Sequence, residues 1–392
     1  MRGLILTIRI LLVRVAFAVG RRAPLRRRVV LATAHSSRLA GNLAIIRDDL
    51  AARAPGVRVV VLAHRQEAGA RGRLVAAWRA LVAGYHLATS RVFIVDDYFF
   101  PIYVISPRKG TTIIQTWHAC GAFKKVGYSV LDKSFGLDEA FARRVRVHSN
   151  YDICLVASQS AAPHYAEAFR QPLERFVSRL GIPRTDVLFG EERLASIRDA
   201  IRQRYGLTDG RRIVLYAPTF RGDSVVDARA TDDLDLVVLQ AALGDDHVVL
   251  VRLHPFIRSR TTIGPDLAGF AIDVSDYPDI NELMLVSDVL VTDYSSAIYE
   301  FSLLGRPMVF FAPDYEAYEL ERGFYFDYRT GVPGPIFETT EALAAYLRAG
   351  TFDLERVERF RQESFDVADG HATARFSDEL VLPFLTGSGA RR

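Results

Sequence analysis

The sequence predicts an α/β protein made of two doubly wound domains, and two observations carry that prediction. Short runs of Val, Ile and Leu alternate with longer, more polar segments along most of the chain. Such apolar runs suit parallel strands that are covered on both faces, and the alternation implies strand–helix–strand units. The chain has 392 residues, which is also enough for two domains of ordinary size.

The first domain is expected to span residues 29–186. Five apolar runs in it predict strands, and they read VVLATA, VRVVVLA, RVFIVDD, TTIIQTW and YDICLVAS in chain order. Two intervening segments, near residues 42–54 and 72–81, predict helices. The stretch LGIPRTD at residues 180–186 carries the Gly and Pro expected where the chain crosses into a second domain.

The second domain is expected to span residues 187–345. It opens with a polar helix at residues 191–205, and four predicted strands follow, at residues 213–216, 248–253, 289–292 and 308–311. Ligands of open α/β sheets collect at the carboxyl ends of the strands, so functional groups should face a cleft shared with the first domain. Residues 346–392 are expected to form helices that pack back on the domains.

Residues 1–28 predict an amphipathic segment that associates with a membrane. An apolar run, LILTIRILLVRVAFAVG, is interrupted by Arg9 and Arg14 and is followed by RRAPLRRR. The interruptions argue against a spanning helix, and the basic cluster argues against a cleavable signal peptide. A helix in the membrane interface, with its arginines reaching anionic headgroups, accounts for both features. The alternative is a first helix that packs on the protein itself.

Composition narrows the function classes. The net charge of +4 and the pI near 9.0 suit phosphate-bearing substrates or an anionic membrane surface, but the cations are spread along the chain and give no case for nucleic acid. Cys120 and Cys154 have neither metal-site nor disulfide-framework spacing, which fits a reducing cytosol. The motifs of P-loop, dinucleotide-binding, serine-hydrolase and zinc-peptidase proteins do not occur.

A histidine and two lysines follow the apolar run at residues 111–114. The segment reads QTWHACGAFKK and contains His118, Lys124 and Lys125. It places a base and two compact cations at the end of a strand, where an open α/β sheet binds anionic substrates. The alternative for the lysines is a solvated surface position.

A hydroxyl-rich turn joins a strand to a helix in VTDYSSAIYEFSLLG, residues 291–305. Thr292, Ser295 and Ser296 add hydroxyl donors to the free amides of a helix start, which predicts a phosphate site. The alternative is ordinary helix capping by Ser295 or Asp293.

Two further strand ends carry candidate ligands of a pyrophosphate. RLHPF, residues 252–256, sets His254 beside Arg252, and APTFRGD, residues 217–223, adds Thr219 and Arg221. A lone histidine in such a place is often structural, and Arg221 could be a solvated loop arginine.

Taken in order, QTWHACGAFKK, LGIPRTD, LYAPTFRGD, RLHP and SDVLVTDYSSAIYEFSLLGRPMVFF resemble the CDP-glycerol glycerophosphotransferase family of wall teichoic acid synthesis. The resemblance implies a GT-B architecture of two Rossmann-like domains with a cleft between them, attached peripherally to the cytoplasmic face of the cell membrane. It implies transfer of glycerol phosphate, or of ribitol or another alditol phosphate, from a CDP-alditol to a lipid-linked glycan, with release of CMP. The family often has HGTP where this chain has HACG, which leaves the subfamily open.

The resemblance also implies roles for the candidate residues. His118 becomes the general base that deprotonates the acceptor hydroxyl, and His254 with Arg252 stabilises the diphosphate as CMP leaves. Thr292, Ser295 and Ser296 grip the phosphate oxygens. Lys124 and Lys125 are expected to guide an anionic acceptor, which is our inference and not part of the motif. No cofactor is implied, and metal dependence stays open.

Two alternatives belong to other classes. One is a nucleotide-sugar glycosyltransferase of the same architecture, which a hexose in the product would reveal. The other is a non-catalytic protein that binds membranes or polyanions, which liposome binding without CMP release would support. The sequence leaves open the alditol, the acceptor, the choice between primase and polymerase, and the oligomeric state.

Overall fold

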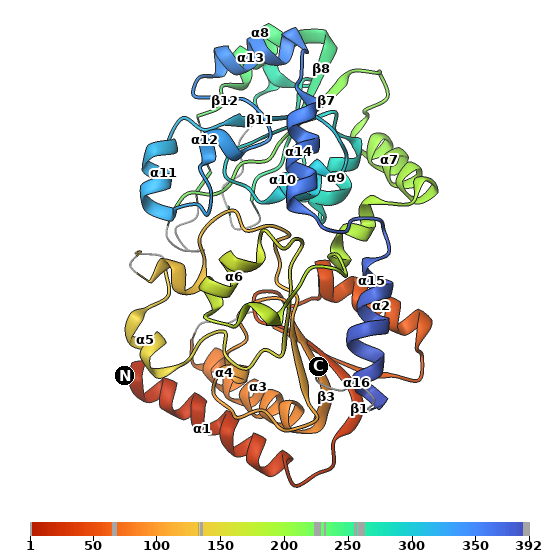
Figure 1. Cartoon of the computed structure of the whole chain (residues 1–392). Helices are drawn as coiled ribbons and strands as arrows, with labels where there is room; N and C mark the ends of the chain where they lie inside the picture. The colour runs from red at the N-terminus through yellow and green to blue at the C-terminus, as the bar shows by residue number, and fades with distance from the viewer. Residues whose placement is uncertain are drawn as a thin grey trace.

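Two six-stranded, fully parallel sheets form the framework of the chain (Figure 1). The computed structural model describes residues 2–64, 69–131, 133, 136–222, 229–230, 233–254, 257 and 263–386. The strands of the first sheet are β1 (Arg26–Thr33), β2 (Arg58–Ala63), β3 (Ser90–Val95), β4 (Thr112–Gln115), β5 (Ile153–Leu155) and β6 (Phe176–Val177). Those of the second are β7 (Arg212–Tyr216), β8 (His247–Val251), β9 (Ala271–Asp273), β10 (Val289–Thr292), β11 (Met308–Phe311) and β12 (Ile336–Phe337).

The strand order creates a switch point in each sheet. The first sheet has the order β2-β1-β3-β4-β5-β6, and the second has β12-β11-β10-β7-β8-β9. The order therefore reverses between β1 and β3, and again between β7 and β10. Ligands of doubly wound sheets bind in the crevice that such a reversal opens at the carboxyl ends of the strands.

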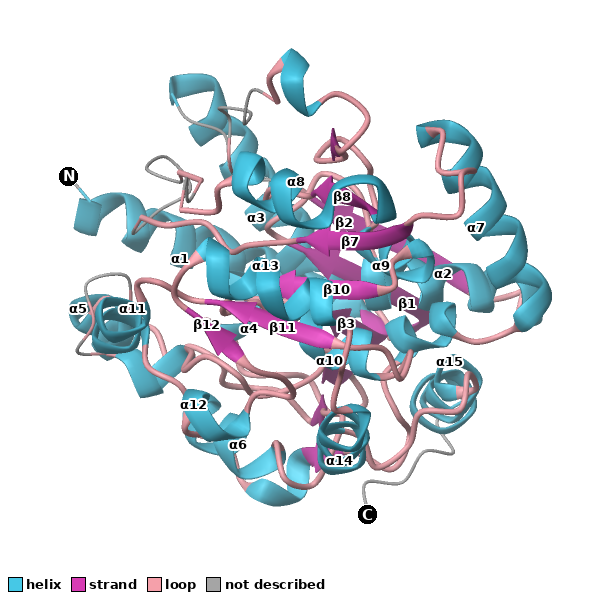
Figure 2. Cartoon of the chain, turned by 90° about the horizontal axis from the view of Figure 1, so that it is seen from above, coloured by secondary structure: helices cyan, strands magenta, loops and turns pink. Residues whose placement is uncertain are grey.

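Helices cover both sheets, and seen from above they surround the strands (Figure 2). Those of the first half are α1 (Arg2–Gly20), α2 (Gly41–Arg53), α3 (Gly69–Thr89), α4 (Phe100–Tyr103), α5 (Glu139–Arg144) and α6 (Ala162–Phe169). Those of the second half are α7 (Glu191–Tyr205), α8 (Leu236–Leu243), α9 (Ile280–Val286), α10 (Ala297–Ser302), α11 (Tyr315–Arg322), α12 (Tyr328–Gly331) and α13 (Thr340–Ala349). The last three are α14 (Leu354–Ser364), α15 (Ala372–Phe376) and α16 (Leu382–Thr386).

Alternate side chains of the strands enter different cores. Val29 and Leu31 of β1 belong to a large apolar cluster that also includes residues of the second sheet, whereas Val30 and Ala32 belong to a cluster under α1 and α3. Both faces of the strand are thus buried, which is why its sequence is apolar throughout. Cys120 and Cys154 are buried and free.

The closing helices return to the first half of the chain. Helix α14 packs on α10, but α15 packs on α2, and α16 packs on β1 and β3. In Figure 1 they run from the upper half of the molecule down beside α2. The division at residues 186 and 345 stays a prediction.

Helix α1 packs on α3 through one face only. Val13 and Phe17 are buried there, and a Cβ at Gly84 of α3 would lie 2.5 Å from the carbonyl oxygen of Val13, so glycine permits the close crossing. The window Gly3–Gly20 is apolar and long enough to cross a membrane by length and composition, and 17% of it is buried. The helix therefore packs on the protein, as one prediction had it, and still presents an apolar outer face.

The buried His148 makes stability sensitive to acid. Its imidazole stacks on Phe169 at 3.9 Å between ring centroids, and burial lowers its pKa to about 3. The unfolded chain, with an ordinary histidine pKa, binds the proton first as the pH falls below about 6.5. We expect this residue alone to reduce the free energy of unfolding by about 2 kcal/mol between pH 7 and pH 5.

Urea unfolding at the two pH values measures this effect. His148→Asn should show a smaller fall, because asparagine cannot be protonated and tolerates the left-handed backbone at this position, where φ is 59°. An equal fall in the variant and the parent would rule out the assignment to His148.

Candidate active site

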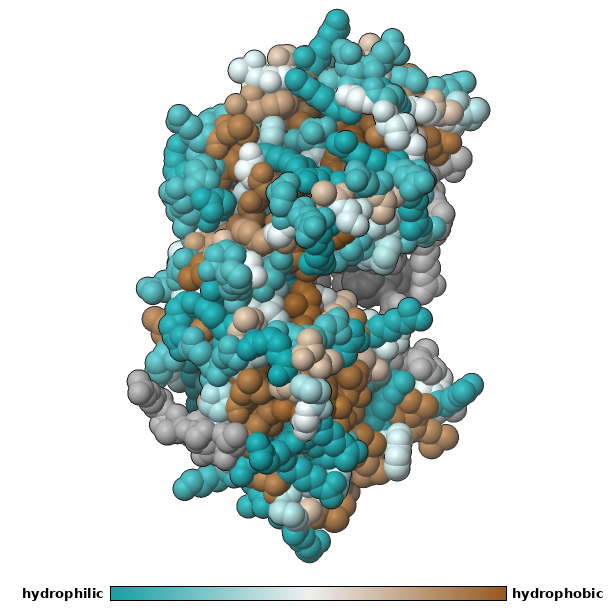
Figure 3. All heavy atoms as spheres, turned by 90° about the vertical axis from the view of Figure 1, so that its right-hand side faces the viewer, coloured by the Kyte–Doolittle hydropathy of each residue, from teal (hydrophilic) through white to brown (hydrophobic). Residues whose placement is uncertain are grey.

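A cavity of about 610 Å³ lies where the carboxyl edges of the two sheets face each other. In the space-filling view the outline of the molecule is indented on one side, between its upper and lower halves (Figure 3). The cavity is lined from the first sheet by His35, Asp96 and His118, and from the second by Thr219, Arg252, His254, Ser295 and Ser296, among others. The switch points of both sheets thus contribute to one site.

Two histidines flank one carboxylate on the first wall. Nδ1 of His35 lies 3.2 Å from a carboxylate oxygen of Asp97, and Nδ1 of His118 lies 3.9 Å from the other. Nδ1 of His118 also lies 3.4 Å from the carbonyl oxygen of Asp96. With acceptors on that side, the proton of a neutral imidazole belongs on Nδ1, which leaves Nε2 of His118 free to accept a proton.

The pKa values of the two neighbouring carboxylates, Asp96 and Asp97, are shifted in opposite directions. Burial raises the pKa of Asp96. Burial would also raise the pKa of Asp97, but the charge of His118 and the hydrogen bond from His35 lower it overall. That bond in turn raises the pKa of His35. Asp97, the carboxylate whose pKa is lowered, therefore faces both imidazoles.

A strained turn aims His118 into the cleft. Trp117 has a φ of 53°, which is unusual for a bulky residue. The side-chain amide of Asn42 donates to the carbonyl oxygens of Thr116 and Trp117, at 3.2 and 2.9 Å, and Gln115 accepts from the amide of Trp117 at 2.8 Å. Three hydrogen bonds hold the turn in this conformation.

The segment after His118 joins the two halves of the molecule. A Cβ on Gly121 would lie 2.0 Å from a ring carbon of Tyr299, so only glycine fits beside α10. The amide of Lys125 donates to the carbonyl oxygen of Gly323 at 3.1 Å, and Nζ of Lys124 donates to the hydroxyl of Tyr318 at 3.2 Å. The lysines are half-buried at this contact, so a role in guiding the acceptor stays a prediction.

Arg252 and His254 lie beside each other on the second wall, and Arg252 supplies the positive charge. Burial, together with the charges of Lys124 and Arg252, lowers the pKa of His254 to about 4, so it is neutral at cellular pH. Arg252 is 7% exposed and donates from Nη1 to the carbonyl oxygen of Leu253 at 2.6 Å. Among the described residues its Nε has no hydrogen-bond partner, although it borders the cavity. Pro255 and Phe256 of the motif lie outside the described residues.

Arg221 and Thr219 belong to a network under the cleft floor. Asp293 accepts from the amide and the hydroxyl of Thr219, at 2.8 and 3.0 Å, and from Arg221 at 2.9 Å. Arg221 also makes two hydrogen bonds to Asp314, at 2.6 and 3.0 Å. Its guanidinium is bound to two carboxylates, so it is not a solvated loop residue, and it is not among the residues that line the cavity; a role in substrate binding stays a prediction. Asp223 of this motif lies outside the described residues.

The three hydroxyl side chains at the end of β10 and in the turn after it differ in burial and in hydrogen bonding. Thr292 is fully buried and donates to the carbonyl oxygen of Ala217 at 2.7 Å, so its hydroxyl is committed to the sheet. Ser295 and Ser296 line the cavity. The Ser295 hydroxyl accepts from the amide of Ala297 at 3.2 Å, which is the local capping considered as an alternative. Ser296 makes no side-chain capping bond within the described structure, so its hydroxyl is available.

Arg184 and Glu300 form a buried ion pair across the cleft that no sequence prediction included. Nε of Arg184 lies 3.1 Å from Glu300, whose side chain is 4% exposed. Arg184 also donates to the carbonyl oxygen of His118, and its amide donates to Asn42 at 2.9 Å. The sequence does show this arginine inside LGIPRTD, but the stretch was interpreted only as the crossover between the two domains.

The two walls are chemically complementary. One presents Nε2 of His118, which has no hydrogen-bond partner among the described residues, and the other presents guanidinium, imidazole and hydroxyl donors. Such a site can deprotonate a hydroxyl group and stabilise an anion opposite it, which is what phosphoryl transfer requires. Among the residues described, no three His, Cys, Asp or Glu side chains are grouped to hold a metal ion.

Comparisons with known proteins agree with this chemistry. The model of the family CDP-Glycerol:Poly(glycerophosphate) glycerophosphotransferase matches residues 15–382. The teichoic acid ribitol-phosphate primase of Bacillus spizizenii is 40% identical over 93% of this chain and 92% of its own length. A poly(ribitol-phosphate) polymerase of the same organism is 36% identical over 76% of this chain, which spans about half of that longer protein.

Solved structures show the same architecture. A structure of the wall teichoic acid polymerase TagF superposes with a TM-score of 0.76 and 25% identity, over 95% of this chain and 93% of that one. The match covers both sheets and the cleft between them. The chain belongs to the CDP-glycerol:poly(glycerophosphate) glycerophosphotransferase family.

Proposed function

We propose that this protein transfers an alditol phosphate from a CDP-alditol to a hydroxyl group of a lipid-linked teichoic acid acceptor and releases CMP. The observation that carries the proposal is the free Nε2 of His118 on one wall of a cleft whose other wall presents Arg252, His254 and Ser296. The GT-B description suits these two walls. One structure of TagF is that of a histidine-to-asparagine variant soaked with CDPG, which supports a CDP-alditol as the donor.

In the proposed reaction, Nε2 of His118 accepts the proton of the acceptor hydroxyl. The hydroxyl oxygen attacks the β-phosphorus of the CDP-alditol, and the bond from that phosphorus to the bridging oxygen breaks. CMP leaves with the bonding electrons. Arg252 and His254 hold the diphosphate oxygens where charge develops, and Ser295 and Ser296 position them. Asp97 keeps His118 in the tautomer that can accept the proton.

We further propose that ribitol phosphate is the transferred group and that the protein primes a chain. The supporting observation is the 40% identity to a ribitol-phosphate primase, against 30% to the glycerol-phosphate primase of Bacillus subtilis. The outward apolar face of α1 supports peripheral attachment of the enzyme to the cytoplasmic face of the membrane.

Purified protein tests the proposal with CDP-ribitol, CDP-glycerol and a UDP-sugar, each offered with a teichoic acid lipid acceptor. We expect CMP release and a product extended by one ribitol phosphate, with CDP-glycerol at least tenfold slower. Chromatography of the nucleotide and mass spectrometry of the lipid measure both. A hexose in the product would establish the glycosyltransferase alternative, and the absence of CMP with every donor would overturn the proposal.

A further inference from the structure

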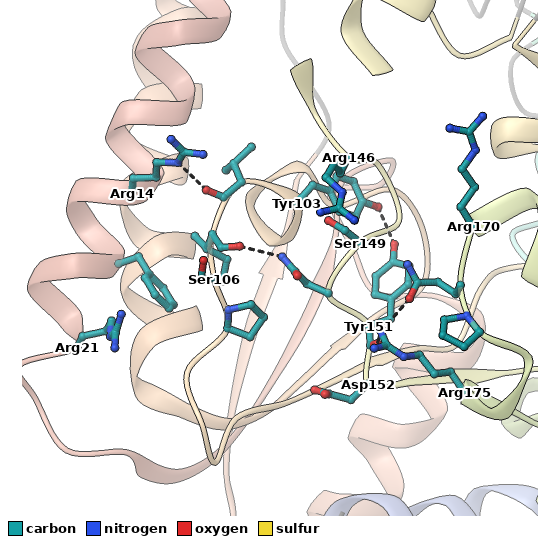
Figure 4. A pocket seen from close by; sticks show the side chains of 17 residues that line it. Arg14, Arg21, Tyr103, Ser106, Arg146, Ser149, Tyr151, Asp152, Arg170 and Arg175 are labelled. Carbon is teal, nitrogen blue, oxygen red and sulfur yellow. Dashed lines mark hydrogen bonds between the residues drawn. The ribbon is translucent and has the colours of Figure 1, made fainter. Parts of the chain in front are cut away.

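A second cavity, of about 870 Å³, lies on the first half of the molecule away from the cleft. Its walls include residues just before β5 and β6, which places it at the amino edge of a parallel sheet whose carboxyl edge forms the active site. Five arginines line it, namely Arg14, Arg21, Arg146, Arg170 and Arg175, and they come from three parts of the chain: the α1 region, the stretch before β5 and the stretch before β6 (Figure 4).

The charge of this cavity is poorly compensated by the protein. Asp152 is the one acidic residue among its lining residues, and its carboxylate already accepts from the amide of Ile113 at 2.9 Å. Within the described part of the chain, the side chains of Arg21 and Arg146 make no hydrogen bond or ion pair. Convergence of like charges is unfavourable unless an anion occupies the space between them.

Other arginines of the cavity are held in place. Nε of Arg14 donates to the carbonyl oxygen of Val104 at 2.8 Å, and Nη1 of Arg175 donates to Gln171 at 2.8 Å. Figure 4 shows these bonds on opposite sides of the hollow. Fixed guanidinium groups keep further N–H donors for a ligand, and their planar geometry matches the oxygens of a phosphate.

The neighbouring helix indicates where that phosphate comes from. Most of the large exposed apolar residues of α1 recur every three or four positions and form one stripe, composed of Leu4, Ile8, Leu11, Val15 and Val19, and Ile5 is also exposed. At about 100° per residue, Arg14 and Arg21 both lie on the same flank of this stripe. When the stripe contacts the acyl chains, this flank and the cavity beside it lie at the depth of the lipid headgroups.

We propose that the arginine cavity binds the phosphate group of an anionic phospholipid headgroup. The stripe on α1 supplies apolar contact with any bilayer, whereas the cavity selects anionic lipids and fixes the tilt of the first sheet on the membrane. The inference rests on the proposed membrane attachment through α1, and it is independent of the transfer reaction.

Vesicle flotation tests the proposal with the full chain. Arg21→Gln/Arg146→Gln should bind vesicles containing phosphatidylglycerol at least tenfold more weakly than the parent, because it removes charge-assisted hydrogen bonds to the bound phosphate in addition to the general attraction of a basic residue to an anionic surface. Binding to pure phosphatidylcholine vesicles should be unchanged. Arg22→Gln/Arg27→Gln is the matched control, because it removes the same charge from exposed residues near the same helix end that do not line the cavity.

The outcomes separate the possible sources of phosphate. Equal losses in the two double variants would mean unspecific attraction and would overturn the proposal. So would calorimetric binding of inorganic phosphate that depends on Arg21 and Arg146 while vesicle binding does not. Leu11→Glu/Val15→Glu should weaken binding to both kinds of vesicle, which tests attachment through α1 separately. CMP release with a water-soluble acceptor should be the same in the cavity variant as in the parent.

Discussion

Replacing His118 by alanine or glutamine should lower turnover by a factor of about 10² to 10⁴. The side chain presents Nε2 to the cleft while Asp97 and the carbonyl oxygen of Asp96 face Nδ1. Without this nitrogen the acceptor hydroxyl must lose its proton to water while it attacks phosphorus. Single-turnover measurement of CMP release from CDP-ribitol gives the rate of the chemical step.

The same variants should still bind the donor, because its proposed ligands lie on the opposite wall. We expect a donor dissociation constant within about threefold of the parent by calorimetry, so that the loss is in turnover. His371→Gln is a suitable control, since this histidine is exposed at the start of α15 and outside the cavity lining. Turnover of His118→Gln close to that of His371→Gln would exclude His118 as the base.

Glu300→Gln should reduce the free energy of unfolding by about 3 kcal/mol. The substitution keeps the volume of the side chain but leaves the guanidinium of Arg184 without its counter-charge in a nearly buried position. Because Arg184 also donates to the carbonyl oxygen of His118, transfer activity should fall too. Urea unfolding and CMP release measure the two effects on the same preparation.

A surface pair provides the comparison. Arg143 and Glu139 of α5 lie 2.7 Å apart, and their side chains are 73% and 64% exposed. Glu139→Gln should cost no more than about 0.5 kcal/mol. The double variant Arg184→Gln/Glu300→Gln should recover part of the loss, because no uncompensated charge remains. If Glu300→Gln reduced the free energy of unfolding no more than Glu139→Gln does, the Arg184–Glu300 pair would not contribute to stability.

Long apolar runs were enough to predict most of the framework. The predicted strands at residues 289–292 and 308–311 and the predicted helix at 191–205 coincide with β10, β11 and α7. The two- and three-residue strands β6, β9 and β12 were not predicted. They are too short to show as apolar runs in the sequence, and only their pairing with a neighbouring strand identifies them. Helix α3 spans residues 69–89, well beyond the predicted 72–81. The prediction was too short because the alanines and Gly84 of this helix give no clear apolar periodicity near its ends.

The site was predictable only where a motif sits directly after a strand. His118 and His254 were found in this way, and both line the cavity. His35 also follows a predicted strand, VVLATA, but it was not singled out, because its significance depends on Asp97, which follows another strand. Thr292 and Arg221 were correctly placed at strand ends, but sequence cannot reveal that their polar atoms are committed to Ala217 and to Asp293 with Asp314.

The return of the chain end to the first sheet affects how the protein can be made. Leu380, Val381 and Leu385 share an apolar cluster with Val29 and Leu31 of β1. A ribosome adds roughly 5–20 residues per second, so β1 and β3 leave it on the order of 15 to 60 seconds before α16 does. During that time the apolar side chains that α16 covers on this face of the first sheet lack their final packing partners. The core beside the first sheet is therefore complete only after α16 has been synthesised.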